Sequence, residues 1–227
     1  GQTLFWLLFL LVIIPTPAPV ADDERSLFTV INSRDHGPGS LWAAILAANN
    51  SPKSSIIKFD SSEAGFANPK TIVLEKSLPL LTGELTIDGS INDRLWKPTG
   101  VIISADMKFP VFQTVEGARV TLKSITIANG NNDRGGGIVN RGSLVVKGVT
   151  FFGNRAAQDG GALVNLGGVV QFINSTFVDN RAGSTGGGFA NNAGQATVTN
   201  CTFSNNSAEQ AGALSNNSDL LLRNSIL

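Results

Sequence analysis

The chain has 227 residues, 15% of which are charged, and its 17 lysines and arginines equal its 17 aspartates and glutamates. This balance creates no positive field for nucleic acid or an anionic membrane, so we expect neither surface as a partner. The single cysteine excludes an intrachain disulfide and a cysteine-based metal cluster, and the single histidine, His36, is the one candidate for histidine-dependent catalysis.

Residues 1–21 have the pattern of a secretory leader. An apolar run from Leu4 to Ile14 is too short to span a bilayer comfortably, and it is followed by prolines and a polar segment. No methionine begins the sequence and no basic residue precedes the apolar run, so we interpret this segment as a truncated leader. We expect a secreted or cell-surface protein; a retained membrane anchor is the alternative.

Residues 22–54 predict a strand followed by a short capping helix. Phe28–Ile31 has strand composition, and after a glycine-proline turn Ser40 is a suitable N-cap for a helix over Leu41–Ala48. Apolar residues recur at positions i, i+3, i+4 and i+7 of this helix, which forms one apolar stripe. We expect it to cover the apolar cross-section that the first coil of a solenoid would otherwise expose.

Residues 55–110 predict irregular first coils. Short strand-like runs occur at 56–59, 71–74, 84–87 and 101–103, separated by turn residues. Two longer segments, 61–70 and 90–99, interrupt this spacing. We expect them to project from one face of the molecule as insertions.

Residues 111–227 contain a repeat, in which glycines are followed by a short apolar run and an asparagine. Its copies begin at Gly135, Gly160, Gly186 and Ala211. Each coil of about 25 residues carries two further runs in which apolar and polar residues alternate. Three short strands per coil predict an all-β fold, a right-handed, single-stranded parallel β-helix with three walls. The sequence stops within a coil at 220–227, and we expect this apolar end to fray or associate.

Stacking of the coils places equivalent residues in columns. Asparagine forms three of them: Asn140, Asn165, Asn191 and Asn216; Asn154, Asn180 and Asn206; and Asn174, Asn200 and Asn224. Asparagine tolerates left-handed corners and can bond the same amide on the next coil, so we interpret these columns as structural ladders. Phe151, Phe177 and Phe203 predict an inward stack. Thr126, Thr150, Thr176 and Thr202 predict an outward column, which we attribute to β-propensity.

Charged residues near the glycine turns form the candidate site. They are Asp133, Arg134, Arg155, Asp159, Asp179 and Arg181. Stacking would bring them within one or two coil spacings and create a shallow contact site for an anionic or hydroxyl-rich glycan. The competing interpretation is a set of exposed ion pairs, which contribute little to stability. We identify no catalytic residue, and we expect no metal and no cofactor.

Two motifs resemble one family. The segment 36–45 and the glycine–asparagine coils are similar to bacterial secreted or surface right-handed β-helix proteins, whose N-terminal motif reads Gly-Ser-Leu-Arg-x-Ala-Ile. The resemblance covers about residues 28–227, with Trp42 in place of the usual arginine and Gly39 where a cysteine often stands. It implies a non-enzymatic, adhesin-like role in surface display, adhesion or glycan contact. Membrane attachment would then depend on the leader or on an anchor beyond Leu227.

The alternative is a polysaccharide lyase or glycoside hydrolase on a pectate-lyase-like β-helix. Such enzymes need paired carboxylates, or a carboxylate cluster for a hard cation together with a base. The regular coils contain no Asp-Asp pair and no Asp-x-Asp. Asp133 and Asp159 come nearest to a pair, and Arg155 or Arg181 would serve as the base.

Overall fold

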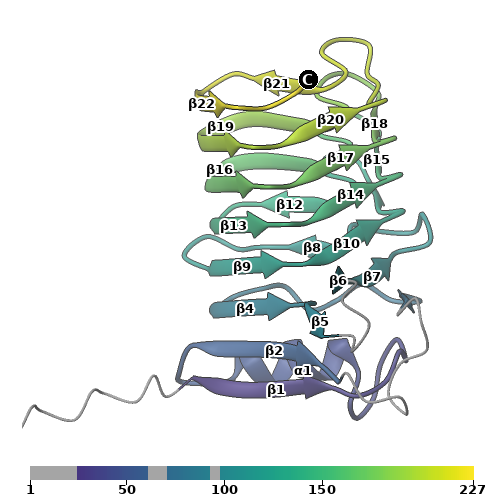
Figure 1. Ribbon diagram of the computed structural model, residues 1–227, viewed down its shortest axis with the longest axis vertical. Coiled ribbons are helices and arrows are strands. Elements are labelled where there is room, and N and C mark those ends of the chain that lie inside the picture. Colours follow the sequence, from purple (N-terminus) through teal and green to yellow (C-terminus); the bar gives the residue numbers. More distant parts are fainter. Residues whose placement is uncertain (1–24, 61–70, 93–97) are drawn as a thin grey trace, which may run out of the picture.

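The computed structural model shows a β-solenoid of about seven turns, with one short helix, over the described residues 25–60, 71–92 and 98–227 (Figure 1). Its first wall contains β1 (Ser26–Val30), β2 (Ser55–Phe59), β4 (Glu84–Asp88), β9 (Arg119–Lys123), β13 (Ser143–Lys147) and β22 (Asp219–Arg223). The second contains β3 (Thr71–Val73), β7 (Val101–Ser104), β10 (Ile125–Ala128), β14 (Thr150–Phe152), β17 (Thr176–Val178) and β20 (Thr202–Ser204).

The third wall contains β8 (Phe112–Gln113), β12 (Ile138–Asn140) and β21 (Leu214–Asn216). Two long strands, β16 (Leu163–Ile173) and β19 (Phe189–Thr199), continue from the third wall into the first. A narrow ladder of two-residue strands follows the second wall: β11 (Asn131–Asn132), β15 (Arg155–Ala156) and β18 (Arg181–Ala182). In the three walls and in this narrow ladder, neighbouring strands pair parallel.

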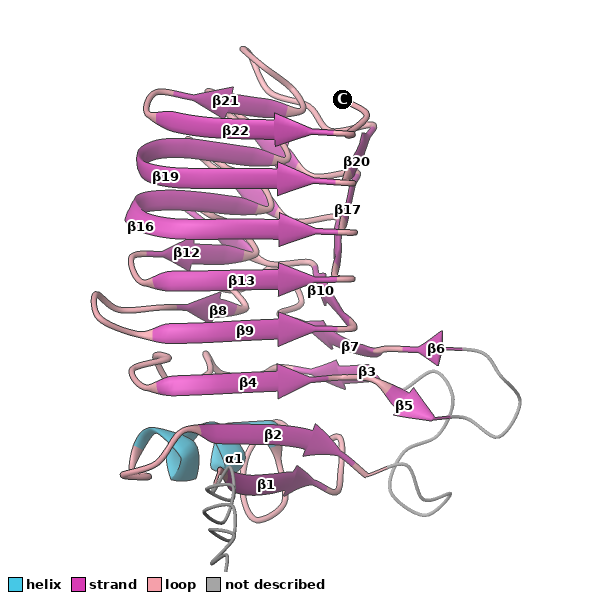
Figure 2. Cartoon of the chain, turned by 60° about the vertical axis from the view of Figure 1, so that its left-hand side comes forward, coloured by secondary structure: helices cyan, strands magenta, loops and turns pink. Residues whose placement is uncertain are grey.

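The coil is right-handed. In Figure 2 the nearer strands β9 and β13 run from left to right, β8 and β12 behind them run from right to left, and the chain climbs from β1 to β22. This arrangement confirms the predicted three-walled parallel β-helix. The strand bounds agree with the predicted runs to within a few residues at most positions, because the alternation of apolar and polar residues defines which side chains enter the core.

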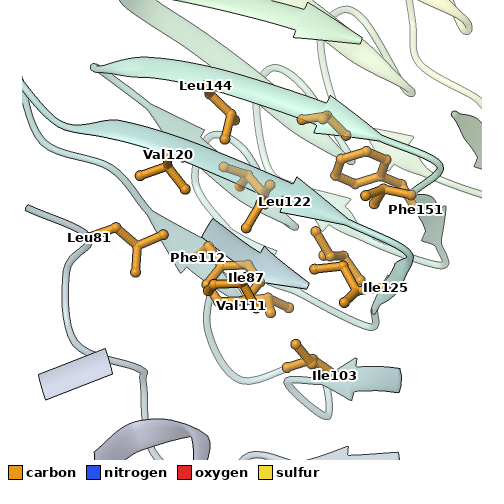
Figure 3. Packing of buried hydrophobic residues seen from close by; sticks show 14 of the residues in the cluster. Leu81, Ile87, Ile103, Val111, Phe112, Val120, Leu122, Ile125, Leu144 and Phe151 are labelled. Atoms are coloured by element: carbon orange, nitrogen blue, oxygen red, sulfur yellow. The ribbon is translucent and has the colours of Figure 1, made fainter. Parts of the chain in front are cut away.

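The core runs along the solenoid axis as one continuous cluster. Residues of β9 and β13 alternate between buried and more exposed positions, and Figure 3 shows Val120, Leu122, Leu144 and Phe151 together in the interior. The predicted phenylalanine stack is present. The ring centroids of Phe151 and Phe177 lie 4.7 Å apart and nearly parallel. Repetition of one side chain at one register position therefore fills the core with stacked copies.

The asparagine columns are of two kinds. Asn140, Asn165 and Asn191 are fully buried, and the Nδ2 of each donates to the Oδ1 of the next coil at 2.7–2.9 Å. The column of Asn154 and Asn180 forms a second buried ladder. These two ladders confirm the structural interpretation, although neither has left-handed backbone.

The third asparagine column differs. Asn174, Asn200 and Asn224 have φ values of 50°, 54° and 44°, so they occupy the left-handed corner between the first and second walls. Their side chains are exposed, and Asn200 donates to Asn174 at 3.2 Å. This column therefore combines left-handed backbone with an exposed ladder contact, whereas the two buried ladders form without left-handed backbone.

The glycine repeat forms a close-packed turn. Gly160 has a φ of +69°, and a Cβ atom there would lie 2.3 Å from the carbonyl oxygen of Leu163. A Cβ on Gly161 would lie 2.2 Å from the carbonyl oxygen of Gly187 in the next coil. Neither position can accept a side chain without moving backbone.

A helix, α1 (Leu41–Asn49), lies at the level of β1 and β2, at the lower end of the solenoid in Figure 1. Ser40 caps it, because its Oγ accepts a hydrogen bond from the Ala43 N–H at 3.2 Å. The predicted stripe is buried: Leu41, Ala44, Ile45 and Ala48. Within the described ranges, no helix is long and apolar enough to cross a membrane.

One of the two predicted insertions is described in part. The strands β5 (Ile91–Asn92) and β6 (Pro98–Thr99) pair antiparallel and project to the right beyond the end of β4 in Figure 2. The second insertion, 61–70, and the leader, 1–21, lie outside the described residues. In the last coil Leu222 is 40% exposed, whereas its equivalents in three preceding coils are buried. Association through this end stays a prediction.

Candidate functional site

The six charged residues predicted as a contact site divide into separate groups. The Nε of Arg134 lies 3.5 Å from the Oδ2 of Asp159 and donates to the Oε1 of Gln158 at 3.0 Å. The amide of Asn192 donates to the same Asp159 oxygen at 2.9 Å. The Asp159 side chain is only 13% exposed. It is therefore engaged by its neighbours and offers little to a ligand.

The other four residues do not join this pair. Arg155 and Arg181 lie in register on adjacent coils and are exposed, with no side-chain partner among the described residues. Asp179 bonds Asn205, and Asp133 is exposed. None of the six lines either of two grooves formed by other described residues.

The first of these, the corner groove, lies where the first wall turns into the second. It has a volume of about 320 Å³. It is lined by Ser90, Ile91, Gly100, Ser124, Ile125, Thr126, Gly148 and Thr150. Residues at the base of the β5/β6 hairpin form one side, and the corners of two consecutive coils form the other.

A change in the corner column opens this groove. Ser124 and Gly148 precede Asn174, Asn200 and Asn224 in the column, and all five have left-handed backbone. The two early coils thus carry a small side chain or none where the later coils carry an amide. A Cβ built on Gly148 would meet no atom within 4 Å, so this position faces open space.

Glycines bring the hairpin against the corner. A Cβ on Gly89 would lie 2.6 Å from the carbonyl oxygen of Ser124, and one on Gly100 would lie 2.5 Å from the same atom. Any side chain at either position would push the hairpin away. The Ser90 hydroxyl donates to the Oδ1 of Asp88 at 2.6 Å, which fixes the first residue of the hairpin beside the groove.

The second groove, the wall groove, lies on the outer face of the first wall and has a volume of about 230 Å³. It is lined by Arg25, Ser54, Ser55, Glu84, Leu85, Thr86, Arg119, Val120, Thr121, Ser143 and Val145. Glu84 and Arg119 face each other in register across β4 and β9. Beside this pair the groove presents mainly hydroxyl groups.

The residues that line the corner groove are suited to binding a ligand. Its lining carries hydroxyl groups, backbone and isoleucine, and no side chain that titrates. Such a surface can exchange hydrogen bonds with sugar hydroxyls through its serine and threonine side chains, while Ile91 and Ile125 are themselves buried in the core. No described group of three or more His, Cys, Asp and Glu side chains is arranged to hold a metal.

The single histidine takes part in a local hydrogen-bond cluster. The Nδ1 of His36 lies 3.1 Å from the Oδ2 of Asp35, whose other oxygen accepts hydrogen bonds from the backbone N–H groups of Glu75 and Lys76. Burial alone would raise the pKa of Asp35, but the hydrogen bonds from Glu75, His36 and Lys76 outweigh it and lower the pKa below 3.8. This cluster ties the first turn to the chain after β3.

Comparison with known proteins gave no matching family model, no matching curated protein and no matching solved structure. The resemblance to secreted β-helix proteins therefore rests on the motifs of this chain alone.

The sequence did contain a signal for the corner groove. The third asparagine column does not continue into the two preceding coils, where Ser124 and Gly148 occupy the equivalent position. Thr126 and Thr150, which the sequence explains by β-propensity, also line the groove. They line the groove because they lie next to the corner and beside the hairpin.

Proposed function

We propose that this protein is a secreted or surface-exposed, non-enzymatic β-helix that contacts a glycan through the corner groove. The observation that carries the proposal is the lining of that groove: four hydroxyl side chains, two isoleucines and two glycines, without a titratable group. Sugars present many hydroxyls and few charges, so recognition by hydroxyl and backbone groups is chemically suited to them.

The scaffold supports this role because the groove is built on rigid elements. Thr126 and Thr150 project from paired strands, and Ser124 and Gly148 stand at corners that repeat along the solenoid. A site held by stacked strands loses little conformational entropy when a ligand binds. The apolar run in residues 1–21 supports export, and the resemblance to adhesin-like β-helices supports a role outside the cell.

Substitution at Gly148 tests the proposal without disturbing the fold. Asparagine already occupies the same left-handed position in three later coils, so Gly148→Asn adds a side chain to the groove with no new backbone strain. The ligands to be tested are hexasaccharides prepared from a panel of neutral and acidic polysaccharides. We expect the affinity of this variant for the hexasaccharides that the wild type binds to fall by about tenfold or more, equivalent to about 1.4 kcal/mol.

The matched control is Asn200→Gly, which makes the reverse change in the same column two coils away. We expect this variant to bind as the wild type does, and calorimetric titration of both variants provides the comparison. Equal affinity of the Gly148→Asn variant and the wild type for every bound glycan would show that the corner groove is not the contact site.

The enzymatic alternative makes a different prediction. A lyase would release unsaturated products from uronic-acid polymers, with an absorbance near 235 nm, and would need a cation and an exposed carboxylate. Asp159 is the carboxylate nearest to that role by sequence, although Arg134 engages it. Calcium-dependent product formation that is abolished by Asp159→Ala would replace the binding proposal with catalysis.

A further inference from the structure

A column of charged residues lies between the corner groove and the wall groove. Lys58, Asp88, Lys123 and Lys147 occupy equivalent register positions on consecutive strands of the first wall. The Nζ of Lys123 lies 4.0 Å from the Oδ2 of Asp88. Lys147 is exposed and has no side-chain partner in the part of the chain that the structure describes. The column therefore carries excess positive charge.

The two lysines join the grooves on the same two coils. Thr121 and Val145 line the wall groove two residues before Lys123 and Lys147. Ser124 and Gly148 line the corner groove one residue after them. At about 3.3 Å per residue, the path from Val145 to Gly148 is about 10 Å. The grooves and the lysines thus form a continuous strip across β9 and β13.

The pairing of these lysines is unfavourable without a ligand. Lys123 and Lys147 face each other on parallel strands, which are about 4.8 Å apart, and like charges in this position repel. Asp88 offsets Lys123 on one side only, because the next coil offers Ile173 beside Lys147. An anionic group placed between the two ammonium groups would convert this repulsion into two charge-assisted hydrogen bonds.

We propose that the strip binds an extended acidic glycan, with one carboxylate held between Lys123 and Lys147. The sugars on either side of that carboxylate lie in the two grooves and exchange hydrogen bonds with their hydroxyl groups. This inference rests on the proposed function, since the corner groove is one end of the strip. It adds the charge of the ligand, its extended shape and its direction along the strands.

The test compares acidic hexasaccharides with their uncharged forms. Hexasaccharides of hyaluronan and alginate, and the carboxyl-reduced counterpart of each, are titrated against the full chain by calorimetry. We expect at least one acidic form to bind about tenfold tighter than its reduced counterpart, and its affinity to fall as salt is added.

Lys147→Gln should remove this preference by lowering affinity for the acidic form while leaving the reduced form unchanged. Lys147→Arg should keep most of the preference. Lys108→Gln is the matched control, because Lys108 is an exposed lysine paired with Asp106 and lies outside both groove linings. This variant should bind like the wild type.

The outcomes separate this inference from the proposed function. The inference is overturned if both acidic forms bind no tighter than their reduced counterparts, or if Lys147→Gln and Lys108→Gln have equal effects. If Gly148→Asn still weakens the reduced hexasaccharides in that case, the corner groove remains a glycan site without charge selection. If Gly148→Asn also has no effect, both proposals fail.

Discussion

The buried asparagine ladder predicts a large and local cost for one substitution. The Nδ2 of Asn165 contacts the carbonyl oxygens of Gly168 and Ala193 and the Oδ1 of Asn191, each at 2.9 Å, and its Oδ1 accepts from Asn140 at 2.7 Å. Asn165→Ala removes all four contacts in a fully buried position. At about 1 kcal/mol for each contact, with a further cost for the acceptors left without donors, we expect a loss of about 3–5 kcal/mol.

Urea unfolding followed by far-ultraviolet circular dichroism measures this loss. The matched control is Asn216→Ala at the exposed end of the same ladder, where the asparagine accepts from Asn191 at 2.8 Å and donates to the Ser218 carbonyl at 2.6 Å. Water can replace those partners, so we expect a loss of about 1 kcal/mol or less. Equal losses for the two variants would refute the argument that burial of the ladder gives it its strength.

Three further predictions concern the turns and the buried polar groups. Gly160→Ala should lower the unfolding free energy by more than about 1 kcal/mol, because Gly160 has a φ of +69°. Ala211→Gly should raise the unfolding free energy, because Ala211 adopts a φ of 51° in the same column. Urea titrations of the two variants measure both changes. The pKa of Asp35 is lower in the folded protein than its usual value of 3.8, so the ionised side chain stabilises the fold fully above pH 3.8, and this contribution is lost as the pH falls through the lowered pKa. Asp35→Asn should therefore reduce the dependence of the unfolding free energy on pH in acid titrations. Burial raises the pKa of the Cys201 thiol, so a thiol reagent should react with it at neutral pH only after unfolding, and rapid reaction of the native protein would contradict its placement in the core.

The repeat made the solenoid predictable. A constant spacing of glycines and asparagines determines which residues share a column, and alternation determines which of them face inward. The ladder at Asn165 and the stack at Phe177 follow from these two facts alone, since neighbours along the axis are identical residues. The short helix was predictable for a similar reason, because its cap and its apolar stripe are local in sequence.

The candidate site was less predictable because it depends on contacts outside the repeat. Stacking was predicted to bring the six charged residues within one or two coil spacings, and of these Arg134 and Asp159 form an ion pair between adjacent coils. The corner groove requires the β5/β6 hairpin to lie against Ser124, and among the described residues this is the one antiparallel pair of strands outside the repeat. The repeat shows that a glycine replaces asparagine at position 148, but it does not show that the hairpin lies beside this position.

The most direct test of the glycan-contact proposal is a map of the bound ligand on the protein. Amide chemical shifts of the isotopically labelled chain are recorded by nuclear magnetic resonance during titration with the hexasaccharide that binds best. The proposal predicts shifts concentrated at Ser124, Thr126, Gly148 and Thr150, with smaller changes elsewhere. Shifts centred on Arg155 and Arg181, or no localised shifts at saturation, would contradict it.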